Sequence, residues 1–147
     1  MKRVPILKRL IGHAGGVAAV EFALVAPLVI GLMMGMFQVS IAMYNYNSLR
    51  GAVDETARYA IVQFQKEERD DEQALDTKAR AIATSSAYNL DPAKLGDNPI
   101  VVLLDDSRVA GALEATITME YEVPSVARMI GMGDIHLRYS RPVFLIS

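Results

Sequence analysis

The sequence predicts an α+β fold: a long N-terminal transmembrane helix that continues as an amphipathic helix and packs on a small antiparallel sheet of about three strands. Three patterns support this prediction. Residues 22–43 carry no charge, apolar residues recur at helical spacing over 49–64, and apolar and polar residues alternate over 112–123. Because the helical patterns come first and the strand patterns last, the order is that of an α+β domain.

The uncharged run is long enough to cross a bilayer. Its 22 residues form a helix of roughly 33 Å, against a hydrocarbon core of about 30 Å. Ten of them are Phe, Leu, Ile or Val, which together contribute roughly −3 to −6 kcal/mol to insertion. We therefore expect the lipid bilayer to surround this segment; the alternative, a buried core helix, is disfavoured by the length.

Basic residues before the run predict its orientation. Lys2, Arg3, Lys8 and Arg9 precede it, and the first sixteen residues contain no acid. The positive-inside rule places the N-terminus in the cytoplasm and the rest of the chain outside. An ordinary secretory signal peptide is disfavoured, because its apolar region is about 7–15 residues long and a small-residue cleavage site follows it.

Two helices are expected after the span. Residues 44–64 form an amphipathic helix, and 73–88 form a second helix that ends at Asn89. The charge run between them, 65–73, is interpreted as a solvated helix end or turn, with an acidic binding patch as the alternative. The residues expected to face the core are Leu49, Val53, Ala57, Ala60, Ile61 and Phe64 in the first helix, and Leu75, Ala79, Ile82 and Ala83 in the second.

The last third of the chain has the period of strands. Strands are expected over 99–106, 112–123 and 135–146, with a connection between the last two that can hold a short helix. Within 112–123, the odd-numbered residues from Leu113 to Val123 form the apolar face, and the even-numbered ones from Glu114 to Glu122 form the polar face. Pro142 favours an edge strand or a bulge. The stripe over 49–64 is the expected cover of the apolar face.

Composition argues against several function classes. Without the first sixteen residues the net charge falls from −2 to −6, which disfavours nucleic-acid binding. There is no Cys, and His13 and His136 are the only histidines, so no metal site is predicted. Asp105 and Asp106 are interpreted as a turn, and His136 as a surface residue. No catalytic motif is present, so we expect no enzyme activity, cofactor or small-molecule substrate.

The start of the chain has a specific pattern. A basic leader ends at Gly16, Val17 follows, and Glu21 is the fifth residue after Gly16, directly before Phe22 and the apolar run. This arrangement resembles the type IV pilin-like proteins. The 45 or so residues from Gly15 through the helix that ends in Arg58-Tyr59-Ala60 resemble more narrowly the TadE and TadF types of minor pilin or pseudopilin, from the Tad (tight adherence, Flp) pilus system.

The resemblance implies that a prepilin peptidase cleaves between Gly16 and Val17. It also implies that Glu21 pairs with the new α-amino group of a neighbouring subunit during fibre assembly. A carboxylate costs about 2.5–3.5 kcal/mol at the centre of a span and less near its end, so a cation across the interface offsets a real penalty. The alternative is a glutamate whose carboxylate lies in water at the cytoplasmic end of the helix.

Small residues recur every four positions in the span. Ala23, Pro27, Gly31 and Gly35 continue a row that starts at Ala19, and Gly31 and Gly35 form a G-x-x-x-G motif that permits close helix approach in lipid. Pro27 removes one helical hydrogen bond and favours a kink. The row is interpreted as a packing ridge, with chance occurrence of small residues as the alternative.

The expected organisation is a leader over 1–16, a transmembrane helix over 17–44 and an exported α+β domain over 45–147. The protein is expected in the bacterial inner membrane, crossing it once, and in the pilus fibre. Its expected partners are a prepilin peptidase, other Tad pilins or pseudopilins and inner-membrane assembly proteins. We expect a role in Tad pilus assembly for surface adherence and biofilm formation. The alternative is an uncleaved single-pass anchor whose exported domain binds a partner.

Overall fold

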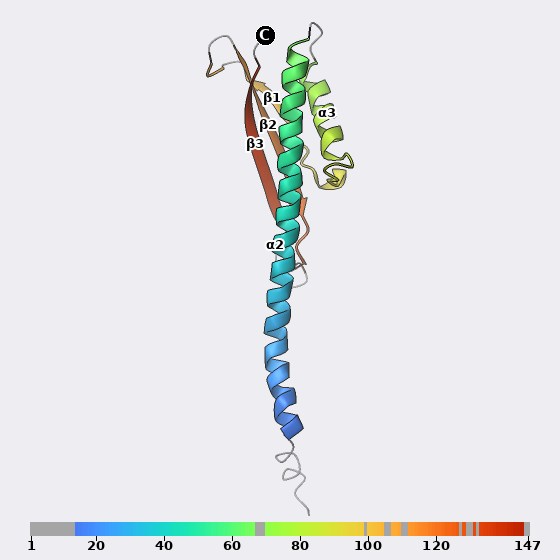
Figure 1. The fold of residues 1–147 in the computed structure, drawn as a ribbon, viewed down its shortest axis with the longest axis vertical. Coiled ribbons are helices and arrows are strands. Elements are labelled where there is room, and N and C mark those ends of the chain that lie inside the picture. Colours follow the sequence, from blue (N-terminus) through green and yellow to red (C-terminus); the bar gives the residue numbers. More distant parts are fainter. Residues whose placement is uncertain are drawn as a thin grey trace, which may run out of the picture. The chain divides into compact units, whose positions relative to one another are not determined.

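A computed structural model describes residues 14–66, 70–98, 100–104, 107–109, 112–126, 128, 131 and 133–145. The elements are helix α2 (Ala14–Phe64), helix α3 (Glu72–Ala83), a 3-10 turn η1 (Pro92–Lys94) and strands β1 (Val101–Leu104), β2 (Leu113–Val123) and β3 (Ile135–Leu145) (Figure 1). The predicted α+β class, with a long N-terminal helix and three antiparallel strands, is confirmed. The chain divides into two compact units, Met1–Gln38 and Val39–Ser147.

Helix α2 is continuous over 51 residues and includes Pro27. In its second half, every third or fourth residue is buried, so that one stripe faces the core of the Val39–Ser147 unit. The fully or almost fully buried residues of this stripe are Leu49, Ala52, Val53, Thr56, Ala57 and Ala60. The predicted stripe is therefore confirmed at Leu49, Val53, Ala57 and Ala60 and at Phe64, which packs against the core, but it is wrong at Ile61, which is 38% exposed. Successive residues rotate by about 100°, so the buried face passes through Ala52 and Thr56 instead.

Helix α3 begins where Asp71 accepts a hydrogen bond from the main-chain N–H of Ala74 (2.7 Å), a standard N-terminal cap. Leu75, Ala79 and Ala83 are buried, and Ile82 packs against the core, as predicted. The helix ends at Ala83 rather than at residue 88. Turns replace its last part, and Asn89 adopts a φ of 51°, a left-handed conformation that Asn tolerates better than most residues.

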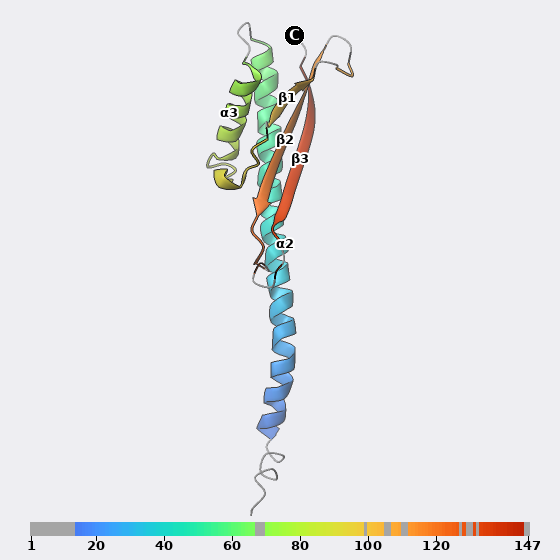
Figure 2. The same ribbon diagram turned by 180° about the vertical axis from the view of Figure 1, so that it is seen from behind.

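The sheet has the order β1-β2-β3, with both pairs antiparallel. Val101 pairs with Ile117, and Ile117 pairs with Arg141. Figures 1 and 2 show β3 at the edge of the sheet away from α3. The expected strands over 99–106, 112–123 and 135–146 are thus present as β1, β2 and β3, with Ile100 and Ala112 just outside the strand bounds. Asp105 and Asp106, for which a turn was expected, lie outside the described residues.

The core forms on one face of this sheet. The stripe of α2 and the apolar face of α3 cover Ala115, Ile117, Met119 and Val143, so the prediction that the 49–64 stripe covers the sheet is confirmed. Contacts at the rim connect α2 to β3. Arg141 donates to Asp54 (2.6 Å), and the ring of Tyr139 meets Tyr46 edge-on at 6.1 Å between centroids.

Pro142 lies on edge strand β3, as predicted, and its position explains why it is tolerated. Thr118 donates its main-chain N–H to Ile100 (2.7 Å), and Glu120 accepts from Gly96 (3.0 Å), so the even-numbered residues of β2 direct their main-chain groups toward β1. The odd-numbered residues therefore pair with β3, where their partners are also odd-numbered. Pro142 is even-numbered, so its missing N–H would have pointed outward and costs no ladder bond.

Glu114 is buried, although the alternation over 112–123 placed it on the polar face of the strand. Its side chain is only 2% exposed. Arg108 covers it, with its Nε 2.9 Å from Oε1, while the Arg108 guanidinium also lies 5.7 Å from the ring centre of Phe144. A buried carboxylate requires such a partner, and the alternation of β2 gives no signal that the loop before it supplies one.

Hydrogen bonds from the Arg108 side chain and main-chain N–H lower the pKa of Glu114. A carboxyl whose pKa is lower in the folded state stabilises the fold above its unfolded pKa of about 4.3. That stabilisation is lost as the pH falls through the folded value. We expect Glu114→Gln to weaken the fold at pH 7 and to flatten the loss of stability between about pH 5 and 3. Denaturant titrations of both proteins across this range test the difference, and parallel curves would contradict it.

Candidate functional site on helix α2

The first half of α2 holds the residues that the sequence pattern singled out. Helix α2 begins at Ala14, so Gly16, Val17 and Glu21 all lie in its first two turns. Val17 and Glu21 are exactly four residues apart and therefore lie on the same side of the helix, about 6 Å apart along its axis. The topology residues Lys2, Arg3, Lys8 and Arg9, and also His13, lie outside the described residues.

This half of the helix presents its apolar side chains outward. Every Val, Leu, Ile, Met and Phe from Val17 to Met43 is exposed, with Phe22 at 73% and Leu24 at 74%. The helix is long and apolar enough to cross a membrane, and its most apolar window has a mean hydropathy of 2.3. An exposed apolar surface of this length requires lipid or other helices around it.

The surroundings of α2 change along its length. Met43 is 56% and Tyr44 62% exposed, whereas Leu49 is 0% exposed. The sequence changes at the same place: after the uncharged run come Tyr44 and Tyr46, and then Arg50 and Asp54. Tyrosines are typical of the membrane–water interface, so this stretch is where the helix is expected to leave the bilayer.

Glu21 is the only acidic residue of α2 before Asp54, and its side chain is exposed. None of the ion pairs among the described residues involves it. A Glu side chain on a helix leans toward the N-terminus, so the carboxylate of Glu21 is directed toward the turn that contains Val17. The arrangement can accept a cation that another molecule, or a newly formed amino group, supplies.

The row of small residues is equally uncovered. A Cβ atom added to Gly31 or Gly35 would meet nothing within 4 Å. Each step of four residues turns about 40° around the helix, so Ala23, Pro27, Gly31 and Gly35 follow an inclined row of the kind along which helices pack. Pro27 leaves the carbonyl of Ala23 without its usual helical donor, although the helix continues through this position.

The sequence patterns missed several groups of residues in the Val39–Ser147 unit. Arg50 lies 6.0 Å from the ring centre of Tyr139, and Arg80 binds main-chain carbonyls sixteen and eighteen residues away. A Cβ on Gly51 would come within 2.5 Å of the Tyr88 ring. Of these groups, only the ion pair between Asp76 and Arg80 could have been found from the sequence, by its i, i+4 spacing. Among the described residues, no group of three or more metal-ligating side chains lies together.

Comparison with known families gives one result. The model of a family described as TadE-like protein matches residues 16–58. Over this segment, the chain is similar to the TadE-like proteins. The matched residues begin at Gly16 and include Glu21, the row of small residues and the start of the buried stripe. Neither the curated proteins nor the solved structures gave a match.

The TadE-like match associates the chain with the Tad pilus and its membrane. It covers the exposed half of α2 and ends at Arg58, before α3 and the sheet begin. The resemblance that the sequence pattern indicated is thereby confirmed for the N-terminal third of the chain. The match does not extend to α3 or to the sheet, so the role of these elements has to be argued from their own surface.

Proposed function

We propose that this protein is a minor pilin or pseudopilin that takes part in assembly of a Tad-type pilus, and so in surface adherence and biofilm formation. The TadE-like helix is the observation that carries the proposal: its first half exposes a continuous apolar surface with a single acidic residue near the start. Such a helix serves equally as a membrane anchor before assembly and as a packing element in a fibre, where neighbouring helices replace lipid.

A prepilin peptidase in the bacterial inner membrane cleaves the chain between Gly16 and Val17 in this proposal. Removal of sixteen residues from the 147 leaves 131 and discards the four basic residues of the leader. The basic leader faces the cytoplasm and the residues after the span are exported. Glycine fits the position before the cleaved bond, because it has no side chain to obstruct a protease.

Glu21 then provides a charge that only a correctly placed neighbour neutralises. Its carboxylate lies at the edge of the apolar surface, where an unpaired charge is costly in lipid or between helices. The α-amino group of Val17 from a neighbouring subunit is the proposed partner. Pairing in another register leaves both charges unpaired, so the contact would set the axial position of each subunit.

We expect Gly16→Leu to block cleavage, because a large side chain then occupies the position before the cleaved bond. The precursor should accumulate in the membrane with its leader attached. Intact mass and N-terminal sequencing of protein extracted from its host's membranes provide the measurement. The wild type should begin at Val17, and the variant at Met1 or at the residue after a removed Met.

Gly15→Leu is the matched control, because it adds the same side chain one residue earlier and should remain cleavable. A wild-type chain that retains its leader, in cells whose peptidase processes its other substrates, would contradict the proposal. The protein would then be an uncleaved single-pass anchor, and its function would rest on what the exported α+β part binds.

A further inference from the structure

The two edges of the sheet differ in whether side chains bind their main-chain N–H groups. At the β1 edge, carboxylates of α3 accept main-chain N–H groups: Glu72 binds the outward N–H of Leu103 (2.7 Å), and Asp76 binds the N–H of Ile100, directly before β1 (2.5 Å). Glu72 thereby occupies a donor that an incoming strand would need. At the β3 edge, no described residue makes a corresponding contact.

The outward groups of β3 follow from its register. Its odd-numbered residues pair with β2, so the main-chain N–H and C=O groups of His136, Arg138 and Ser140 point away from the sheet. No main-chain hydrogen bond among the described residues involves these groups. Pro142 lacks a donor and ends the usable edge, which leaves a stretch of five residues, 136–140, long enough for a short strand to add.

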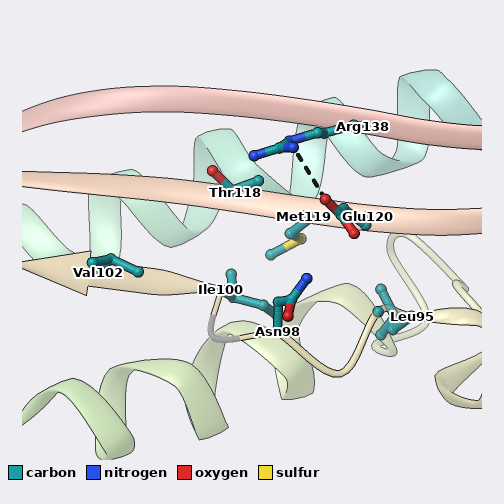
Figure 3. Close-up of a pocket in the computed structure, with 9 residues that line it drawn as sticks. Leu95, Asn98, Ile100, Val102, Thr118, Met119, Glu120 and Arg138 are labelled. Carbon is teal, nitrogen blue, oxygen red and sulfur yellow. Dashed lines mark ion pairs between the residues drawn. The ribbon is translucent and has the colours of Figure 1, made fainter.

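Cations flank this edge on both faces of the sheet. Strand β3 contains Arg138 and Arg141 and no acidic residue; on the open face, Glu120 and Glu122 of β2 lie beside it, one strand away from the edge. On the open face, Arg138 is 70% exposed and reaches Glu120 only at 3.5 Å. Figure 3 shows this ion pair. On the face toward α2, Arg50 lies against Tyr139 and forms no ion pair with a described carboxylate.

We propose that the outer edge of β3 binds an extended acidic segment of a partner protein, which adds as a fourth strand. The main-chain groups of 136–140 would supply the hydrogen bonds. Acidic side chains on consecutive residues of the added strand would point to opposite faces, one toward Arg138 and the next toward Arg50. Arg141 is already held by Asp54 (2.6 Å) and contributes little to this selection.

A second copy of β3 is a poorer occupant. Antiparallel pairing that uses all three outward residues places Arg138 opposite Arg138, and His136 opposite Ser140. Like charges directly opposite one another destabilise a strand pair. The charge pattern therefore favours a different, acidic strand over self-association through this edge. The inference rests on the sheet and on Arg50 of α2, and it is independent of the leader, of Glu21 and of their proposed roles.

The test uses the full chain in detergent and a capped hexapeptide, Thr-Val-Glu-Glu-Val-Thr, labelled for fluorescence anisotropy at low salt. A second peptide has Lys in place of both Glu. A third, Thr-Pro-Glu-Glu-Pro-Thr, keeps the charge but loses main-chain donors on both of its edges. We expect the first peptide to bind at least tenfold more tightly than either control, and to slow amide exchange at His136, Arg138 and Ser140.

Ser140→Pro removes one outward donor and adds a ring at the edge without loss of a bond to β2. It should weaken binding of the glutamate peptide at least tenfold, whereas Ser140→Ala should leave binding within twofold. Both variants lose the contact between Ser140 and Thr118 (2.8 Å), so they are matched in that respect. Arg138→Ala should also weaken binding of the glutamate peptide. This variant tests the charge alone, because it leaves the main-chain groups of the edge unchanged.

Any one of five results would overturn the proposal, the first four of which concern peptide binding. These are equal binding of the proline and valine peptides, equal binding of the lysine peptide, no binding up to millimolar peptide, and binding unchanged by Ser140→Pro in a folded variant. Concentration-dependent dimers of the chain that Ser140→Pro abolishes would also overturn it, because a second copy would then be the occupant.

Discussion

Glu21→Gln is expected to leave membrane insertion intact and to reduce incorporation into pili at least tenfold. The substitution removes the charge but keeps nearly the same shape, so the apolar surface around it, which drives insertion, is unchanged. In the fibre, the amino group of Val17 would then lack its anionic partner in a place shielded from water. Leaving one member of a buried ion pair unpaired costs several kcal/mol, and a tenfold effect needs only about 1.4 kcal/mol.

Sheared pili and membrane fractions, each quantified with an antibody to the exported part, provide the measurement. Glu55→Gln is the matched control, because Glu55 is an exposed acid on the same helix but beyond the expected span. Glu21→Asp tests whether the carboxylate must extend as far as a Glu side chain allows to meet the amino group, since Asp keeps the charge on a shorter side chain. If Glu21→Gln enters pili as well as the Glu55 variant does, the charge-pairing role is wrong.

A contact within one chain is the competing explanation of any Glu21 effect, because Val17 lies one turn away on the same side of the helix. The two explanations differ in cells that express both forms. If Glu21 binds the amine of its own chain, each variant subunit carries its own defect and wild-type neighbours are unaffected. If it binds a neighbour's amine, variant subunits also disturb the wild-type chains beside them, and wild-type incorporation falls.

Much of the fold could be predicted because each element carries its own period. The alternation over 112–123 identified β2 with its apolar face, and the helical spacing of Leu49, Val53 and Ala57 identified the side of α2 that covers it. The apolar pattern failed to predict burial where the rotation of successive residues around α2 decides which side chains face the core. Ile61 follows the apolar pattern but rotates out of the core. Thr56 lies on the core-facing side of α2, and it can be buried there because its hydroxyl donates to the carbonyl of Ala52 (2.8 Å).

The candidate site on α2 could be predicted because its residues are neighbours in sequence. Gly16, Val17 and Glu21 form one short pattern, and the family match begins at that pattern. Contacts between distant segments gave no such signal. Asp54 and Arg141 are 87 residues apart, and nothing in either local pattern indicates that they meet. The β3 edge, which no described residue covers, likewise depends on the strand order, which the sequence patterns do not reveal.

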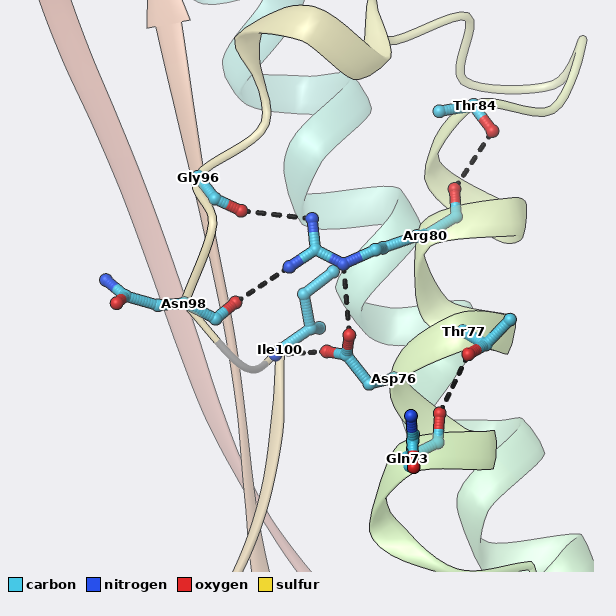
Figure 4. A network of polar contacts seen from close by, with 8 residues as sticks. All are labelled: Gln73, Asp76, Thr77, Arg80, Thr84, Gly96, Asn98 and Ile100. Carbon is cyan, nitrogen blue, oxygen red and sulfur yellow. Dashed lines mark hydrogen bonds and ion pairs between the residues drawn. The ribbon is translucent and has the colours of Figure 1, made fainter.

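Arg80 shows how much of the α+β part depends on one such distant contact. Its guanidinium donates to Asp76 Oδ2 (3.0 Å) and to the main-chain carbonyls of Gly96 (3.0 Å) and Asn98 (2.9 Å), as Figure 4 shows. Asp76 in turn accepts from the N–H of Ile100. One planar cation thereby joins α3 to the segment that leads into β1.

We expect Arg80→Ala to lower the free energy of unfolding by about 2–4 kcal/mol, because hydrogen bonds to charged groups contribute about 1.5–3 kcal/mol each and the site is partly shielded from water. Arg80→Lys should recover less than half of this, since a single ammonium group cannot reach three acceptors in different directions. Thr77→Ala is the matched control: Thr77 binds only a carbonyl of its own helix (2.9 Å), and its loss should cost less than about 0.5 kcal/mol.

Chemical unfolding of the full chain in detergent, followed by circular dichroism and by amide exchange in β1, measures these differences. In Arg80→Ala, the amides of Ile100 and Leu103 should exchange faster, because Asp76 and α3 no longer hold that edge. A variant that unfolds at the same denaturant concentration as Thr77→Ala would show that the Arg80 contacts contribute no net stability. Faster exchange without a lower unfolding midpoint would restrict their role to closing the β1 edge, which leaves β3 as the edge open to a partner.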